Sequence, residues 1–360
     1  MLPRINYTSN SGASRWITIS LVALLLASAA FVAWAVYATR SNDEKAKQVA
    51  EIGGVSKIPG VKFNCPLDGT KVDDRAAAGR RPIVVQVDNA PPARPQVGLS
   101  RADIVYEAMA EGDVTRFSAI FACHESETVG PVRSSRLITL ELAPEYSALL
   151  ADSGGSEGVN AELTNSDIAR ITHPAFPDAF WRVDDRFAPH NLMTSTEAIR
   201  QAAAGADEPV TATLPSLSFK EDKPAPAVAN IGITYSGSVD VGYRYDAGSN
   251  SWLRFLGGEP HIDALTGEQI RVKNVIIQYV DISESGIVED VGGNVGLAFG
   301  LTGSGPVQIF RDGQQINGTW KREGRKQITS YADEAGKPIA LNRGLTFIQV
   351  VPKDFQPSVS

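Results

Sequence analysis

Two arginines and two serines occupy one short turn of the sequence, Gly130 to Arg136. Its opening glycine and proline favour a tight turn, and the serines stand where a helix N-cap uses a hydroxyl. Backbone amides at a helix start favour negative charge, and a guanidinium offers paired donors that match a carboxylate or phosphate. Arg133, Ser134 and Arg136 therefore predict a seat for an anionic group. The alternative is that both arginines form ion pairs with acids of the same domain.

Three functions are compatible with this turn. In the first, Arg94 and Arg116 join it in an Arg-rich cleft that binds an anionic cell-envelope polymer or an envelope protein. In the second, carboxylates and a histidine (His124 or His190) serve as the acid and base of a glycan or peptide hydrolase. In the third, the chain docks a membrane partner through an exposed sheet edge. The sequence has no HExxH or SxxK motif and favours binding over catalysis. The candidate site residues, none assigned as catalytic, are Asp88, Asn89, Arg94, Glu107, Glu111, Arg116, Arg133, Ser134, Arg136, Asp152, His190 and Asn191.

The composition is that of a folded protein, with 43% hydrophobic and 21% charged residues among 360. A formal net charge of −7 lacks the basic surplus of nucleic-acid-binding proteins, so we exclude that class of partner. The two cysteines, Cys65 and Cys123, show no zinc-ligand spacing, and we expect neither metal nor cofactor. Outside the cytoplasm they could form a disulfide. The alternative is two unpaired thiols.

The N-terminal segment predicts a membrane anchor. Residues 16–39 contain no charged side chain, and the run from Leu21 to Val36 is rich in leucine, alanine and valine. A cleaved signal peptide is the alternative, because Ala27 to Ala29 offers small residues at a suitable spacing. The length of the apolar run favours an uncleaved single span. We therefore expect residues 1–15 in the cytoplasm, residues 16–39 in the cell membrane, residues 40–60 as a tether and the bulk of the chain outside.

Residues 61–205 predict a mixed α/β domain with a central sheet, so the fold class is α+β. Ile83 to Val87 is typical of a buried strand, and segments 103–111 and 115–124 form a hairpin through Gly112 and Asp113. Alternation places Arg116 on one face of this hairpin, where the acids of the preceding strand would meet it. Further expected elements are helices over 137–145, 159–170 and about 196–205, and a strand over 146–152.

Residues 206–228 are rich in proline, alanine, serine and threonine, and we place a linker there. From 229 to 356 the pattern changes to short strands separated by glycine-containing turns. This predicts a second, mostly antiparallel β-sheet domain. Its expected strands include 243–245, 252–255, 275–280, 295–301, 306–310, 319–321 and 346–351.

Several long motifs resemble the YerB-like family of bacterial extracytoplasmic proteins, known as DUF3048. In the first half they are Arg81-Pro82, residues 87–89, residues 93–107, Glu111-Gly112, residues 115–117, residues 130–136 and residues 190–192. In the second half they are Tyr245-Asp246, Arg254-Phe255, Gly258, Asp263, residues 273–278 and residues 318–320. Together they cover about Asn64 to Pro352.

The resemblance implies the domain layout and the extracytoplasmic location, but the family is named for unknown function and supplies no catalytic residue. Many of its members resemble lipoproteins with a lipid-attachment cysteine. This chain departs from that pattern, because an apolar segment stands where the lipid anchor would be.

Overall fold

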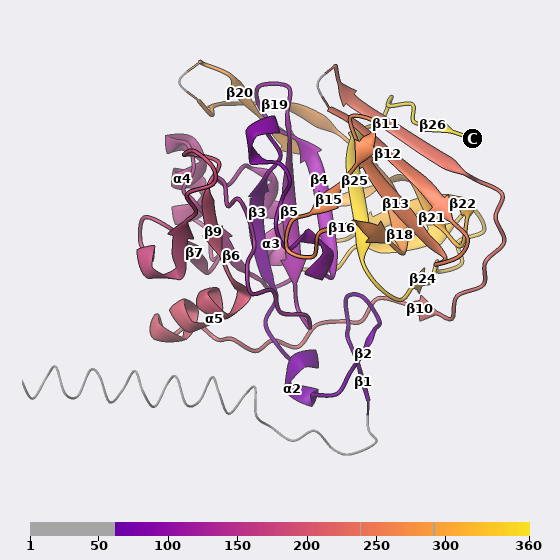
Figure 1. Ribbon diagram of the computed structural model, residues 1–360, viewed down its shortest axis with the longest axis horizontal. Helices are drawn as coiled ribbons and strands as arrows, with labels where there is room; N and C mark the ends of the chain where they lie inside the picture. The colour runs from indigo at the N-terminus through magenta and orange to yellow at the C-terminus, as the bar shows by residue number, and fades with distance from the viewer. Residues whose placement is uncertain (1–61, 238, 291) are drawn as a thin grey trace, which may run out of the picture. The chain divides into compact units, whose positions relative to one another are not determined.

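The computed structural model describes residues 62–237, 239–290 and 292–360 (Figure 1). The expected cytoplasmic stretch, membrane span and tether, residues 1–60, lie outside the described residues. Within the described ranges, no helix combines the length and the hydropathy needed for a bilayer span. All described residues belong to one compact unit.

A ten-stranded mixed sheet runs through this unit in the order β23-β22-β21-β18-β25-β4-β5-β3-β6-β7. At its centre β25 (Thr346–Pro352) runs parallel to β4 (Ile104–Met109), with Phe347 opposite Val105. The remaining strands are β3 (Ile83–Asp88), β5 (Thr115–Phe121), β6 (Leu149–Asp152), β7 (Arg170–Thr172), β18 (Asn274–Val280), β21 (Gly303–Arg311), β22 (Gln314–Arg322) and β23 (Ser330–Asp333).

This sheet corrects one expectation. The sequence predicts a separate sheet on each side of residues 206–228, but β4 and β25 come from either side and pair directly. The physical reason is burial: β18 is buried along its whole length and β25 at all residues but its last, so both need neighbours on their two edges and faces. A β-rich α+β architecture with few helices is the part of the fold expectation that the structure confirms, whereas the single large mixed sheet is new.

A six-stranded sheet covers one face of the ten-stranded sheet. It has the order β14-β13-β12-β11-β26, and β17 pairs with β13. One core cluster contains Val105 and Phe347 of the large sheet together with Val241 and Trp252 of the small one. The bounds are β11 (Asn230–Ser236), β12 (Val239–Asp246), β13 (Ser251–Leu256), β14 (Glu259–Pro260), β17 (Arg271–Val272) and β26 (Ser358–Val359).

Helices α3 (Ile138–Glu145) and α4 (Glu157–Thr164) contribute to the other core cluster, on the opposite face. Helix α5 (Thr196–Gly205) packs into the first cluster and begins at Ser195, whose hydroxyl accepts from Ala198 N. These helices confirm the expectations for 137–145 and 196–205. The expected helix over 159–170 is wrong in its second half, because residues 170–172 form β7.

Short elements complete the described part of the chain (Figure 1). The hairpin of β19 (Ile282–Val288) and β20 (Val295–Phe299) lies against α4. The others are β1 (Phe63–Asn64), β2 (Lys71–Val72), α2 (Arg75–Ala78), η1 (Pro91–Ala93), η2 (Leu99–Arg101), η3 (Pro177–Ala179), β8 (Phe180–Arg182), β9 (Leu192–Thr194), β10 (Phe219–Lys220), β15 (Ile262–Asp263), β16 (Glu268–Gln269) and β24 (Leu341–Asn342).

Candidate functional site

Asp88, the last residue of β3, is the centre of a polar site at the carboxyl end of that strand. Its carboxylate is 1% exposed, and Oδ2 lies 2.7 Å from His190 Nδ1 and 3.2 Å from Arg133 Nε. The side chains of His190 and Arg133 are 20% and 30% exposed. One buried carboxylate thus positions two partly exposed nitrogen donors.

Backbone hydrogen bonds hold the turn, residues 130–136, beside the end of β3. Asp88 N donates to Pro131 O, and Arg133 N donates to Gln86 O, so residues 131–133 follow the end of β3. Ser153 N, beyond the end of β6, donates to Arg133 O. The turn is therefore held between the carboxyl ends of two parallel strands, where α/β sheets commonly bind ligands.

The pKa of Asp88 lies below its ordinary value. Burial acts in the opposite direction, but the charge of Arg116, the amide of Ala90, the hydrogen bond to His190 and the charge of Arg133 together outweigh it. Asp88 is therefore ionised at neutral pH, and its charge holds Arg133 in place.

Arg116 lies directly opposite Asp88 on β5 and is buried. Its Nη1 donates to Ser134 O at 2.8 Å. Burial, followed by the charge of Arg136, lowers the pKa of Arg116 to about 10, so it still carries its charge at neutral pH. Arg116 neutralises Asp88 from inside the fold and is not presented to solvent.

Arg136 is also enclosed. Its Nε donates to Glu111 Oε2 at 2.5 Å, Nη2 bonds the other oxygen of Glu111, and Nη1 donates to Ser135 O. Burial would raise the pKa of Glu111, but Arg136 holds it below its ordinary value. Of the two arginines in the turn, only Arg133 faces solvent. Arg136 is in the internal ion pair that the alternative interpretation described, and a leucine, Leu137, rather than either serine is the N-cap of α3.

Sequence reasoning missed Glu289, which follows β19. Its carboxylate lies 3.5 Å from Arg136 Nε, on a side chain with no exposed surface. Burial raises the pKa of Glu289, although Arg136 opposes this. No local signal could have linked Glu289 to the turn, because the contact depends on how the β19–β20 hairpin packs.

Buried polar atoms without a hydrogen bond concentrate here. They are Gln86 Oε1, Arg116 Nε, Arg133 Nε and both carboxylate oxygens of Glu289, five of the nine such side-chain atoms in the described residues. Two of the five, Arg133 Nε and Glu289 Oε2, are in ion pairs with Asp88 and Arg136. Native proteins satisfy nearly all buried polar atoms with protein or water partners. Their concentration marks this region as the place where bound water or a ligand is expected.

Asp152 supports the turn instead of facing solvent. It is fully buried and accepts hydrogen bonds from Ser135 Oγ, Gly154 N and two nitrogens of Arg170. All of its acceptor capacity is used within the fold, so it cannot act as a free acid or base.

Glu107 lies on the other face of the large sheet. In the hairpin it stands opposite Phe117, whereas Arg116 stands opposite Ala108, and directly opposite residues share a face. The expectation that this acid meets Arg116 is therefore wrong. Asn89 Nδ2 donates to Glu107, and Arg94 donates to Asn89 O. Glu107, Asn89 and Arg94 form a second network, which Gln96 links to the backbone of Asp88.

Asn191 and Ser134 have local roles. Asn191 Oδ1 accepts from Arg182 Nη1, and its Nδ2 donates to Val183 O, so it orders the loop that presents His190. Ser134 contributes its carbonyl, which accepts from Arg116.

A GxSxG pattern at Gly154 to Gly158 was also missed. It lies between β6 and α4, where a nucleophilic serine would stand on a strained turn. Ser156 instead has φ −60° and ψ 164° and caps α4 by accepting from Val159 N. This is the geometry of an N-cap.

Two groups of three side chains in the described part have ligand atoms within 4.8 Å of one another. In the first, Cys65 and Cys123 are joined in a disulfide, so no thiolate is present beside Asp103. In the second, Asp68, Asp103 and His124, the His124 Nε2 already contacts Asp68 Oδ2 at 2.9 Å. We assign a metal to neither, and its expected absence stays a prediction.

Comparison with known proteins places these residues in a family. The model described as "Protein of unknown function (DUF3048) N-terminal domain" matches residues 67–209, and the corresponding C-terminal domain model matches residues 231–348. The chain belongs to the DUF3048 family. The "Putative lipoprotein YerB" of Bacillus subtilis (strain 168) is 34% identical over 305 residues, which cover 83% of this chain and 89% of that protein.

A solved relative has the same fold. The crystal structure of the YerB protein from Bacillus subtilis matches with a TM-score of 0.74 and 31% identity, over 83% of this chain and all of that one. This confirms the YerB-like family that the motifs indicated. The family assignment leaves the activity open, because the family is one of unknown function.

Proposed function

We propose that this chain is a membrane-attached extracytoplasmic protein that binds an anionic group of a cell-envelope component at Arg133 and His190. The description of the Bacillus relative as a lipoprotein supports the location. In this chain the apolar segment 16–39 would replace the lipid as the anchor.

The shared contact of Arg133 and His190 with Asp88 is the observation that carries the proposal. Asp88 fixes Arg133 through Nε and His190 through Nδ1. Among the described residues, the Nη atoms of Arg133 and the Nε2 of His190 have no hydrogen-bond partner. An oxyanion that approached the end of β3 would meet Arg133 Nη donors whose orientation is already set, which reduces the entropy cost of binding. His190 Nε2 adds a further donor in the imidazolium form of that side chain.

The local charge supports an anion. Arg116, opposite Asp88, compensates the buried carboxylate from within the fold, and Glu111 compensates Arg136. The remaining acid, Glu289, lies beside Arg136 with a pKa that burial raises, which favours its neutral form, and Arg133 is the partly exposed cation of the site. A carboxylate or phosphate oxygen is the group that a guanidinium and an imidazole N–H recognise best.

Co-sedimentation of the full-length chain with purified cell walls tests the proposal. Arg133→Gln and His190→Gln should each reduce retention at least about fivefold, the loss expected for one charge-assisted hydrogen bond. The matched control is Arg271→Gln, an exposed arginine on β17 that pairs with Asp246. Its retention should equal that of the wild type.

Two comparisons make the result decisive. Walls stripped of their phosphodiester polymers should lose retention if the recognised group is a phosphate and keep it if the group is a carboxylate. Equal retention of the Arg133 variant, the His190 variant and the wild type would exclude this site. Circular dichroism of each variant would show that the fold is retained.

A hydrolase is the second candidate, favoured by the hydrogen bond that His190 Nδ1 donates to Asp88 Oδ2. A carboxylate on Nδ1 orients an imidazole so that Nε2 can take a proton from water or a substrate. Glu111 and Glu289, with opposite pKa shifts around Arg136, form a carboxylate pair of the kind that divides acid and base roles.

Product formation distinguishes a hydrolase from a binding protein. If the chain is a hydrolase, soluble products should appear when it is incubated with envelope glycans or peptides. His190→Gln should then slow product release by about 10²-fold or more. Retention without products supports the binding proposal, and crosslinking to a membrane protein without wall retention supports the docking alternative.

A further inference from the structure

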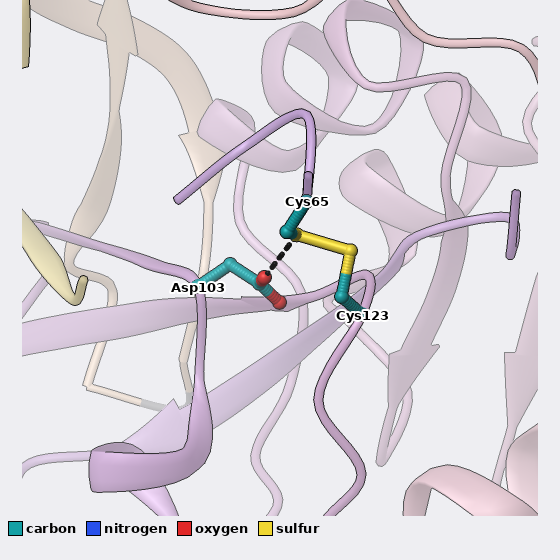
Figure 2. Close-up of side chains that lie close together, drawn as sticks. All are labelled: Cys65, Asp103 and Cys123. Atoms are coloured by element: carbon teal, nitrogen blue, oxygen red, sulfur yellow. Dashed lines mark hydrogen bonds between the residues drawn. A yellow bond between two sulfur atoms is a disulfide. The ribbon is translucent and has the colours of Figure 1, made fainter. Parts of the chain in front are cut away.

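A second titratable group lies at the opposite end of the β4–β5 hairpin, around the disulfide Cys65–Cys123 (Figure 2). Asp103, just before β4, is fully buried, and its Oδ1 lies 3.0 Å from Cys65 Sγ. Its Oδ2 accepts from Ala122 N at 2.6 Å. The amide fixes one carboxyl oxygen of Asp103 and leaves the other against the sulfur.

The contact between Asp103 and Cys65 shows which of the two groups carries the hydrogen. A disulfide sulfur carries no hydrogen, so the sulfur cannot donate to the carboxylate. Only a protonated Asp103 can donate to the sulfur. Burial and the charge of Asp68 raise the pKa of Asp103 to about 7, so this proton is exchangeable near neutral pH.

Two further groups connect Asp103 with solvent. Asp68 is 2% exposed, and its Oδ2 lies 2.9 Å from His124 Nε2. The side chain of His124 is 37% exposed. The ligand atoms of Asp68, Asp103 and His124 all lie within 4.8 Å of one another, close enough for proton transfer with small side-chain movements. A proton path therefore leads from the surface to the sulfur.

A disulfide with a purely structural role does not require such a path. Burying two carboxyl groups beside it costs free energy that an apolar lining would avoid. Cys65 precedes Leu67 in a segment whose strands β1 and β2 pair only with each other among the described strands. The disulfide ties that segment to the end of β5.

We propose that Cys65–Cys123 is a redox-active disulfide and that Asp103 exchanges a proton with the sulfur of Cys65. This site is independent of the proposed anion site. The reductant is a dithiol of the kind that thiol oxidoreductases carry.

Reduction of the disulfide takes two thiol–disulfide exchanges. A thiolate of the dithiol attacks Cys123 Sγ, since Cys123 is 5% exposed and Cys65 is fully buried, and the S–S bond breaks. Cys65 leaves with the electron pair and takes the proton from Asp103, which is reprotonated from water through Asp68 and His124. The second thiol of the reductant, deprotonated by water, attacks the mixed disulfide and releases Cys123 as a thiolate, which takes up that proton. Two electrons pass to this chain, and the reductant becomes a disulfide.

Other charged groups face this site from the elements packed around it. Arg80 donates to Cys123 O, Arg200 of α5 donates to Ala122 O, and Arg101 of η2 acts on His124. Glu125 pairs with both Arg80 and Arg200 and offsets part of their positive charge.

Reduction of the full-length chain by dithiothreitol tests the proposal. Free thiols are followed by alkylation and mass spectrometry between pH 6 and 9, and each rate is divided by the concentration of dithiothreitol thiolate. The wild-type value should fall as the pH rises through about 7. Asp103→Asn should lower it at least about tenfold at pH 6 and abolish its pH dependence.

The matched control is Asp263→Asn, since Asp263 is another fully buried acceptor of backbone amides, distant in the chain from the disulfide. Its rate should equal that of the wild type. If the disulfide of Asp103→Asn is reduced as fast as that of the wild type or faster, the disulfide is purely structural. The same conclusion follows if Asp263→Asn lowers the reduction rate as much as Asp103→Asn does. If Asp103→Asn does not fold, His124→Gln decides: we expect a rate at least about threefold lower at pH 6, and an unchanged rate overturns the proposal.

Discussion

Arg254 of β13 and Glu107 of β4 form an ion pair in which neither side chain has any exposed surface, with Arg254 Nη2 2.8 Å from Glu107 Oε2. Arg254 Nη1 also donates to Tyr243 Oη, and Arg254 Nε donates to His261 Nδ1. Burial, then the charges of Arg254 and Arg94, holds the pKa of His261 far below its ordinary value. His261 is therefore neutral and donates from Nε2 to Gln96. This network joins the two sheets and the two DUF3048 segments.

Removing one partner of this pair should destabilise the fold strongly. Arg254→Met leaves Glu107 buried without its cation, and we expect the free energy of unfolding to fall by about 3–5 kcal/mol. Urea unfolding followed by circular dichroism measures this. Arg254→Met with Glu107→Gln should recover part of the loss, and Arg271→Met at the exposed pair with Asp246 should change stability by less than about 1 kcal/mol.

The disulfide should contribute substantially to stability. It links residues 58 apart in sequence, and the chain-entropy model gives about 4 kcal/mol for a loop of this length. The unfolding free energy of the Cys65→Ala, Cys123→Ala double variant should be lower than that of the oxidised wild type by this amount. A difference below about 1 kcal/mol would mean that the unfolded chain gains little freedom when the link is absent.

Asp103 should give the stability a pH dependence of defined sign. Its pKa is about 7 in the folded chain and about 4 when unfolded, so the folded state binds the extra proton between these values. Stability is then lost as the pH rises from about 4 to 7, by on the order of 4 kcal/mol for this group. Asp103→Asn removes this loss. Between about pH 4 and 7, the unfolding free energy of Asp103→Asn should therefore rise relative to that of the wild type. A difference between the two proteins that does not change with pH would contradict the raised pKa of Asp103.

Glu289→Gln tests the role of the buried carboxylate beside Arg136. The raised pKa of Glu289 shows that burial disfavours its charge, so the neutral amide should change stability by less than about 1 kcal/mol. Under the binding proposal, cell-wall retention should equal that of the wild type, because Glu289 pairs with the enclosed Arg136. Under the hydrolase alternative, loss of a proton donor should instead reduce turnover while retention stays constant.

Local patterns allowed much of the fold to be predicted. The apolar run at 83–87, the Gly112-Asp113 turn and the serine cap of α5 each depend on neighbours within a few residues, and the structure has β3, the β4–β5 hairpin and α5 there. The motif at residues 130–136 likewise helped to indicate the YerB-like family, which the family models confirm. The helix expected over 159–170 ends at Thr164, and Arg170 instead pairs in β7 and bonds Asp152.

The sequence by itself determined several of the longer strands, the start of α5, the family and the grouping of the turn with Asp88 and His190 as candidates, because these follow from periodicity, capping and motif identity. Only the tertiary structure decided that β4 and β25 share one sheet and that Glu107 pairs with Arg254, 147 residues away. It also decided that Arg136 is enclosed by Glu111 and Glu289 while Arg133 stays exposed. Ion pairs and exposure depend on which distant surfaces pack together, and no local pattern records that.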